Sequence, residues 1–278
     1  MYKSKLLAPV GVASVIVLLI FSSAQSGDAS SASATSASFV ERFDKFDAGR
    51  WIKSDGWSNG PQQKCTWKAD NVRAESGTLE LTLRASPSDK KGFTCAEIQS
   101  KGTYGYGTYE VRMRAPAAPG LVTAFFTYIG KAQGKPHDEI DFEFLGKDTG
   151  AVQLNYYVSG KGGHEHMAKL GLDAETTPAL YSFEWKPNAI FWYINGELVY
   201  ERHAKPGHPI PTNPGKIFLS IWNGNDMDEW LGSFEYPGKP LVALYDLVAF
   251  TKAGDACQFP ESVVCKREKI RKAQLDDD

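Results

Sequence analysis

Apolar and polar residues alternate in short runs across residues 39–251, most clearly in 79–84, 107–114 and 190–194. This period of two is typical of half-buried antiparallel strands, and Gly, Pro and Asn separate the runs about every ten residues. Asn195-Gly196 lies between two such runs and predicts a two-residue hairpin. No stretch after the first residues keeps a helical period for three turns. The pattern predicts an all-β jelly-roll sandwich of two antiparallel sheets.

The first residues differ from this pattern. Lys3 and Lys5 precede an apolar run over residues 6–21 and small residues that end near Ala24. This order predicts a signal peptide over residues 1–24, with an uncleaved membrane anchor as the alternative. Residues 25–38 are mostly Ser and Ala and predict a flexible linker. We therefore expect a globular domain over 39–253 and a C-terminal extension over 254–278, of which residues 266–278 form a solvated or frayed tail.

Export to an oxidising compartment makes two disulfides the natural interpretation of four cysteines. Three pairings are open, and spacing alone favours the nearest neighbours, Cys65 with Cys95 and Cys257 with Cys265. Zinc is disfavoured because the cysteines lack ligand spacing. His164 and His166 are one strand step apart, but no third metal ligand is evident in the sequence.

The charge balance argues against one class of partner. The chain has 31 Lys and Arg against 33 Asp and Glu, a net charge of -2 at pH 7. Binding to a phosphate backbone relies on a surplus of basic side chains, which this sequence does not have. We expect no nucleic acid partner.

The candidate chemistry lies in residues 137–146, which read HDEIDFEFLG. On a strand Glu139, Asp141 and Glu143 share one face, while the hydrophobic residues between them share the other. A helix would separate Asp141 from the two glutamates. The alternatives are an ordinary acidic strand face or a calcium site, but like charges in a row destabilise a strand and no nearby cations compensate them.

The spacing of the acids suits glycoside hydrolysis. Positions 139 and 143 lie roughly 13 Å apart along an extended strand, and two glutamates that lean together approach the carboxyl separation of about 5 to 5.5 Å of retaining glycosidases. Coupled acids also keep at least one carboxyl protonated near neutral pH. One glutamate would then attack the sugar and the other donate a proton, with Asp141 orienting the nucleophile. Spacing alone does not assign nucleophile and acid.

The acidic segment and its surroundings resemble glycoside hydrolase family 16, and within it the bacterial lichenases, which are endo-β-1,3-1,4-glucanases. The likeness extends over about residues 39–251 and rests on ten blocks in order and spacing: 59–60, 65–69, 95–97, 104–107, 125–128, 138–148, 155–157, 162–165, 222–224 and 230–233. Ten blocks in register make the resemblance specific.

The resemblance implies a jelly roll with a concave sugar-binding cleft and no cofactor for catalysis. By position, Glu139 resembles the nucleophile, Glu143 the acid/base and Asp141 their helper. Cys65 and Cys95 match the family disulfide, in agreement with the pairing favoured by spacing. A structural calcium ion is also implied, at the positions of Arg42, Gly77 and Asp246.

Substrate contacts are carried over to residues whose aromatic faces stack on sugars or whose polar groups bind hydroxyls. These are Asn59, Glu97, Asn155, Tyr157, Glu165, Trp222 and Trp230. The chain departs from lichenases at His137, Gln99 and Ser220, where they usually have Trp, Arg and Asn. His137 is a further candidate substrate contact or a donor to the acids.

The departures leave the substrate open. His137 also occurs in the plant xyloglucan-modifying branch of the family, which makes transglycosylation an alternative. Gln99, Lys161 and Lys169 would suit processing of an acidic exopolysaccharide. A non-catalytic carbohydrate-binding jelly roll is the alternative from another class of protein. We expect a secreted monomer, extracellular or periplasmic, that has no stable association with a membrane and cleaves a β-glucan.

Overall fold

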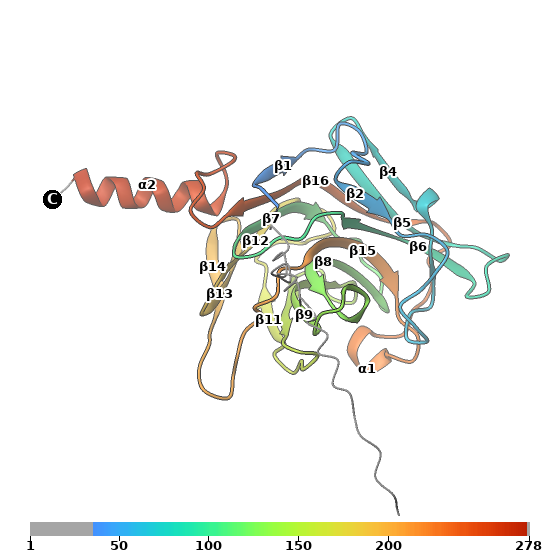
Figure 1. Ribbon diagram of the computed structural model, residues 1–278. Helices are drawn as coiled ribbons and strands as arrows, with labels where there is room; N and C mark the ends of the chain where they lie inside the picture. The colour runs from blue at the N-terminus through green and yellow to red at the C-terminus, as the bar shows by residue number, and fades with distance from the viewer. Residues whose placement is uncertain (1–35, 277–278) are drawn as a thin grey trace, which may run out of the picture. The chain divides into compact units, whose positions relative to one another are not determined.

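Two antiparallel sheets make up most of the computed structural model, which describes residues 36–276 (Figure 1). The first sheet has the order β11 (His166–Lys169), β10 (Ala151–Tyr157), β9 (Asp138–Leu145), β8 (Leu121–Ile129), β15 (Lys216–Asn223) and β6 (Phe93–Ser100), with β2 (Trp51–Lys53) on β6. The second has the order β5 (Thr78–Ala85), β16 (Leu241–Lys252), β7 (Gly107–Arg114), β12 (Ala179–Lys186), β13 (Ala189–Ile194) and β14 (Glu197–His203).

Shorter elements complete the fold. β1 (Phe39–Glu41) pairs with β16, β4 (Val72–Glu75) with β5, and β3 (Thr66–Trp67) runs parallel to β6. The two sheets meet where the end of β5 pairs with the start of β6. The helical elements are η1 (Ala69–Asn71), η2 (Lys131–Gln133), α1 (Asp228–Leu231) and α2 (Val263–Asp276). The predicted all-β jelly roll is confirmed.

The hydrophobic core lies between the two sheets and contains the apolar half of each alternating strand. Phe125 of β8 and Phe142 of β9 contact Phe183 of β12 at ring-centroid distances of 5.6 and 6.4 Å. All three side chains are fully buried. Because one face of β9 is fixed in this core, its opposite face must point out of the sandwich.

The predicted hairpin and the disulfide pairing are both confirmed. Asn195 and Gly196 join β13 to β14 with φ values of 51° and 86°, the left-handed conformation that a two-residue hairpin turn requires. Cys65 is bonded to Cys95 and Cys257 to Cys265.

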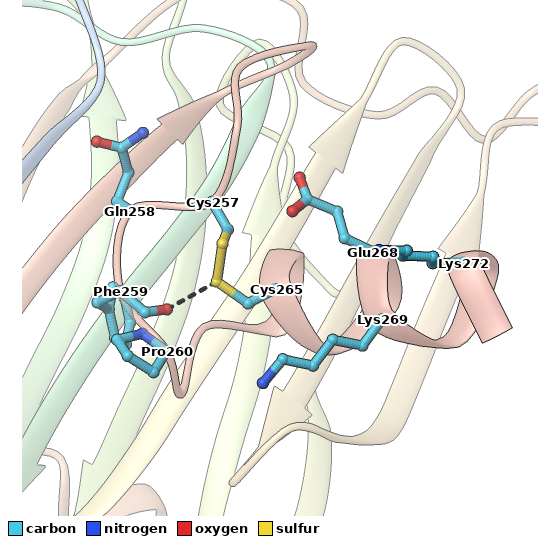
Figure 2. Close-up of a pocket in the computed structure, with 8 residues that line it drawn as sticks. All are labelled: Cys257, Gln258, Phe259, Pro260, Cys265, Glu268, Lys269 and Lys272. Atoms are coloured by element: carbon cyan, nitrogen blue, oxygen red, sulfur yellow. Dashed lines mark hydrogen bonds between the residues drawn. A yellow bond between two sulfur atoms is a disulfide. The ribbon is translucent and has the colours of Figure 1, made fainter.

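The C-terminal extension differs in part from its prediction, because residues 263–276 form helix α2 where a solvated or frayed tail was expected (Figure 1). The first part of the extension, before the exposed part of α2, is attached to the second sheet. Phe259 packs on Leu180 and Leu247, and the Cys257–Cys265 disulfide ties the loop to the first turn of the helix (Figure 2). From Glu268 onward the described side chains of α2 are exposed.

The N-terminal predictions fall mostly outside the described residues. The predicted signal peptide over 1–24 and the predicted linker as far as residue 35 belong to that part of the chain. Within 36–38, Ser36 donates its backbone N–H to Thr103, and Ser38 bonds the side chain of Asp255. Across residues 36–276 no helix is both long and apolar enough to cross a membrane.

Candidate active site

The three acids of the predicted site lie on β9 and point to the same side of the first sheet. Glu139, Asp141 and Glu143 all line one cleft, whereas Ile140 and Phe142 between them are fully buried in the core. The strict alternation of β9 therefore separates a face that lines the cleft from a face that packs in the core.

Strand register extends this face into a grid. One row across β10, β9, β8, β15 and β6 consists of Gln153, Glu143, Ala124, Ser220 and Glu97. The next row consists of Asn155, Asp141, Phe126, Phe218 and Gln99. A third row, as far as β15, consists of Tyr157, Glu139, Tyr128 and Lys216. The acids are thus separated from the wall on β6 by two strands.

The cleft over this grid has a volume of about 630 Å³. Its floor beside the acids is aromatic, because the rings of Phe126 and Phe218 stack with centroids 5.0 Å apart and an interplanar angle of 14°. Further lining comes from Trp57, Asn59, Gln62, Glu97, Gln99, Ala124, Tyr128, Ala132, Gln133, His137, Ser220 and Trp222. A flat floor with polar walls is suited to sugar rings.

Asp141 is the most buried of the three acids, with 2% of its surface exposed. Among the described residues no hydrogen-bond donor reaches either of its carboxyl oxygens, and the carboxyl of Glu139 is one of its acidic neighbours. Burial, followed by the charges of Glu139 and Glu143, raises the pKa of Asp141 well above its usual range. A proton held between Asp141 and Glu139 satisfies both groups.

Glu143 is held by a chain of side chains from outside β9. The indole Nε1 of Trp230 donates to Gln153 Oε1 at 3.0 Å, and Gln153 Nε2 donates to Glu143 Oε2 at 2.6 Å. Burial, and then the charge of Glu139, raises the pKa of Glu143 to about 8, although the bond from Gln153 lowers it. Glu143 is therefore protonated near neutral pH, as a general acid must be.

Glu139 has a different neighbour, because the Nε2 atom of His137 contacts its carboxylate. The imidazole of His137 stacks on Tyr157 with ring centroids 4.9 Å apart and an interplanar angle of 15°. The ring of Tyr128 lies 5.0 Å from His137 on a tilted plane. Two aromatic neighbours thus fix the ring that contacts Glu139, and an N–H at Nε2 stabilises the carboxylate.

The remaining predicted contacts are not all at the cleft surface. Asn59, Glu97, His137 and Trp222 line the cleft. Asn155 and Tyr157 lie on β10 opposite Asp141 and Glu139, and Trp230 acts through Gln153. Glu165 is exposed, yet its charge contributes to the raised pKa values of Asp141 and Glu143.

Sequence reasoning missed several residues of the site, among them Gln153, Tyr128 and Phe218. Gln153 alternates with Asn155 and Tyr157 along one strand, so the period of two was a signal that could have identified it. No comparable signal marks Phe218, because its place beside Phe126 follows from the pairing of β15 with β8.

A second hollow, of about 580 Å³, lies beside α2 and is lined by the Cys257–Cys265 disulfide, Phe259 and Pro260 (Figure 2). Its charged residues are Glu268, Lys269 and Lys272, all on the exposed part of α2. One carboxylate and two ammonium groups do not supply an acid pair, so we place the candidate active site at β9.

The predicted calcium positions are brought together in part. The main chain at Gly77 lies close to the Arg42 carbonyl, since a Cβ at Gly77 would be 3.9 Å from that oxygen. The carboxylate of Asp246, however, accepts a hydrogen bond from Arg112 Nε at 2.6 Å. Within residues 36–276 no cluster of three His, Cys, Asp or Glu side chains forms a metal site. The residues fit calcium only in part.

Comparison with known proteins gives consistent matches. Residues 59–238 match the family described as "Glycosyl hydrolases family 16". An endo-1,3-1,4-β-glycanase of Rhizobium meliloti is 47% identical over 84% of this chain and 86% of its own length. A β-glucanase of Bacillus subtilis is 47% identical over 86% of this chain and 97% of its own. A solved structure, the Bacillus licheniformis β-glucanase, has a TM-score of 0.74 at 46% identity and covers 79% of this chain and 100% of its own.

Proposed function

The chain belongs to glycosyl hydrolase family 16, and on that premise we propose that it is a retaining endo-β-glucanase that cleaves β-1,3-1,4-glucan. The names of its Bacillus relatives support a β-glucan substrate, and the name of the R. meliloti relative supports the 1,3-1,4 linkages. The observation that carries the proposal is the pair of glutamates in the cleft, of which Glu143 has a pKa raised to about 8. Such a pair supplies one proton donor and one nucleophile.

In the proposed mechanism Glu139 is the nucleophile. The contact with His137 keeps the Glu139 carboxylate oriented. Glu143 protonates the departing glycosidic oxygen while Glu139 forms a bond to the anomeric carbon. Glu143 then takes a proton from a water molecule whose oxygen bonds to the anomeric carbon, which breaks the bond to Glu139, releases the sugar and restores the protonated acid.

Asp141 is proposed to move a proton rather than attack the sugar. It lies between the two glutamates and has no donor of its own among the described residues. While Glu139 is ionised, Asp141 holds the shared proton. As Glu139 loses its negative charge in forming the glycosyl bond, the proton on Asp141 becomes easier to release, because one source of repulsion has gone.

The proposal is tested with Glu139→Gln, which keeps the shape of the side chain but removes the nucleophile. We expect the rate of sugar release from β-1,3-1,4-glucan to fall by more than about 10³-fold while oligosaccharide binding is retained. Wild-type turnover in this variant would refute the mechanism. Glu201→Gln, on the exposed strand β14, is the matched control.

The stereochemistry of the first product gives a second test. A covalent intermediate predicts release of the β-anomer, which ¹H NMR detects before mutarotation. Release of the α-anomer would indicate direct attack by water. No release from any β-glucan between mildly acidic and mildly basic pH would favour the non-catalytic carbohydrate-binding protein instead.

A second candidate substrate is a glycan with sugars other than glucose. The R. meliloti relative is named a glycanase, and His137 stacks on Tyr157 at the wall beside Glu139. Analysis of the products from mixed-linkage glucan, laminarin, xyloglucan and a bacterial exopolysaccharide distinguishes the candidates. Products longer than the starting oligosaccharide would identify transglycosylation.

We also propose that the protein is secreted and acts as a monomer. The two disulfides support an oxidising compartment. Protein recovered from culture medium should begin near Gln25 and elute as one chain in gel filtration. Recovery only in a membrane fraction would indicate that the N-terminal segment is an anchor.

For calcium we propose weak binding by Arg42, Gly77 and Asp246 in competition with Arg112. The support is the short distance between Gly77 and the Arg42 carbonyl together with the bond from Arg112 to Asp246. Calcium should raise the Tm more in Arg112→Met than in the wild type. Equal rises in Tm in the two proteins, or no rise in either, would contradict a calcium site at these residues.

A further inference from the structure

Lys216, Gln99, Ser54 and Glu97 form a continuous hydrogen-bonded chain along the wall of the cleft that lies opposite the acids. Lys216 Nζ donates to Gln99 Oε1 at 2.9 Å. Gln99 Nε2 makes a long contact of 3.5 Å with Ser54 Oγ, which donates to Glu97 Oε1 at 2.6 Å. None of these bonds is needed to hold the strands, because β6 and β15 pair through their main chains.

The hydrogen bonds of this series all run in one direction because its first member, Lys216, can only donate. An ammonium group has three N–H donors and no acceptor, so the Gln99 atom that faces Lys216 must be the carbonyl oxygen. The amide NH₂ of Gln99 is thereby turned away from Lys216. One of its hydrogens points toward Ser54, and the other is available to the cleft, which Gln99 lines.

At the other end of the hydrogen-bonded series, the bond between Ser54 and Glu97 has the same donor-to-acceptor direction. Ser54 gives its hydroxyl proton to Glu97 Oε1, which makes that oxygen an acceptor. Glu97 is 2% exposed, and burial raises its pKa to about 7 although the bond from Ser54 lowers it. In the protonated form its proton is on the other oxygen. Glu97 then presents an O–H donor next to the Gln99 N–H.

The register places this donor wall within reach of a bound sugar chain. Glu97 is in the row of Glu143, and Gln99 is in the row of Asp141. Three strand spacings of about 4.8 Å separate β6 from β9, or roughly 14 Å. The side chains that line the cleft within residues 36–276 include no lysine or arginine, so Lys216 acts on the sugar only through the amide.

We propose that Lys216 is a positioning residue that orients Gln99, and that Gln99 is a specificity-determining residue whose N–H binds a sugar oxygen acting as acceptor. The inference rests on the proposed function, since the ligand is a glucosyl unit of the same cleft. It predicts that this wall recognises ring, glycosidic or hydroxyl oxygens through their lone pairs rather than through hydroxyl hydrogens.

The decisive variant is Gln99→Glu, which preserves shape and strengthens the pairing with Lys216 but replaces the donor by an acceptor. We expect KM for β-1,3-1,4-glucan to rise about tenfold, with kcat changed less than about threefold and the Tm equal to or above that of the wild type. A purely structural pairing also allows a higher Tm but predicts an unchanged KM, and an unchanged KM would overturn the proposal.

Lys216 is tested by two further variants. Lys216→Met frees the amide to rotate and should raise KM about threefold, whereas Lys216→Arg keeps a donor-only partner and should restore KM to within about twofold of the wild type. Lys205→Met removes an exposed lysine outside the cleft lining and is the matched control. Equal KM values for Lys216→Met and Lys205→Met would contradict the positioning role.

Binding separates this inference from the proposed function. Calorimetry with a mixed-linkage tetrasaccharide in the Glu139→Gln background measures the wall without catalysis. An inactive wild type that still binds the tetrasaccharide, and loses about tenfold in affinity with Gln99→Glu, would refute the hydrolase and keep the donor wall. An active wild type whose affinity is insensitive to Gln99→Glu would support the hydrolase and refute the donor wall.

Discussion

Asp141 and Glu110 are two buried carboxyl groups in opposite sheets, with 2% and 0% of their surfaces exposed. Burial raises the pKa of both. Their neighbours differ. Among the described residues, Asp141 receives no hydrogen bond from any donor and stands between two other acids, whereas three donors surround Glu110.

The donors to Glu110 come from β12 and from the residues at the start of α2. Ser182 Oγ and the backbone N–H of Val263 donate to Glu110 Oε1 at 3.1 and 2.9 Å, and Ser262 Oγ donates to Oε2 at 2.5 Å. These bonds lower a pKa that burial raises. Glu110 therefore joins α2 to the second sheet. Burial alone does not identify a catalytic acid, because the surrounding donors or acids decide its role.

The largest expected effect comes from Asp141→Asn, which removes the proton that Asp141 shares with Glu139 in the proposed mechanism. We expect kcat to fall about 10³-fold. The Tm should stay constant or rise, because an amide is neutral and can donate to both glutamates. A loss of Tm with an unchanged kcat would show that Asp141 is a structural residue like Glu110.

The converse variant is Glu110→Met, which leaves two hydroxyls and one N–H buried without an acceptor. The free energy of unfolding should fall by about 3 kcal/mol, measured by urea denaturation, while kcat stays within about twofold of the wild type. An effect on kcat with an unchanged stability would mean that Glu110 communicates with the cleft.

The difference between these regions also explains what the sequence predicted. Alternation in 139–144 was sufficient to place the acids on one face. A shift of the strand by one residue would bury the acids and expose the hydrophobic residues, so the pattern fixes which face points outward. Nearest-neighbour spacing was sufficient for both disulfides. By contrast, the bond between Glu110 and Ser262 joins residues 152 positions apart, and no local pattern reports such a contact.

The C-terminal helix was missed for a related reason. Half of the residues of α2 are charged, and Ile270 in its middle is 60% exposed. A helix that packs only at its start has no apolar stripe to detect. The alternation with Asn155 and Tyr157 could have placed Gln153 on the cleft face, but its hydrogen bonds to Glu143 and from Trp230 join other elements and have no local pattern.

A smaller effect is expected from the double variant Cys257→Ser/Cys265→Ser. The disulfide closes a loop with a sequence separation of 8, for which loop entropy predicts a loss of about 2 kcal/mol. Because Glu110 and Phe259 still hold the extension, the loss should appear as faster hydrogen exchange in α2, with kcat unchanged. A kcat below half the wild-type value would show that α2 supports the cleft.

The last prediction concerns pH, through Glu143. Its raised pKa of about 8 means that the folded protein holds this proton where the unfolded chain, with the usual value of 4.5, has lost it. The contribution of Glu143 to stability therefore falls as pH rises from about 4.5 to about 8 and is constant above. The proposed mechanism needs the same proton for activity, so kcat should fall about fivefold between pH 8 and pH 9.

Variants of Gln153 and Trp230 test whether Glu143 controls the alkaline limb, because they should move it in a defined direction. The N–H of Gln153 donates to the ionised form of Glu143 and lowers the pKa. Gln153→Leu should therefore move the alkaline limb of the kcat profile to higher pH. Trp230→Phe, which releases the amide that Trp230 orients, should move it in the same direction by a smaller amount. A shift to lower pH in either variant would mean that another group, and not Glu143, is the acid that controls this limb.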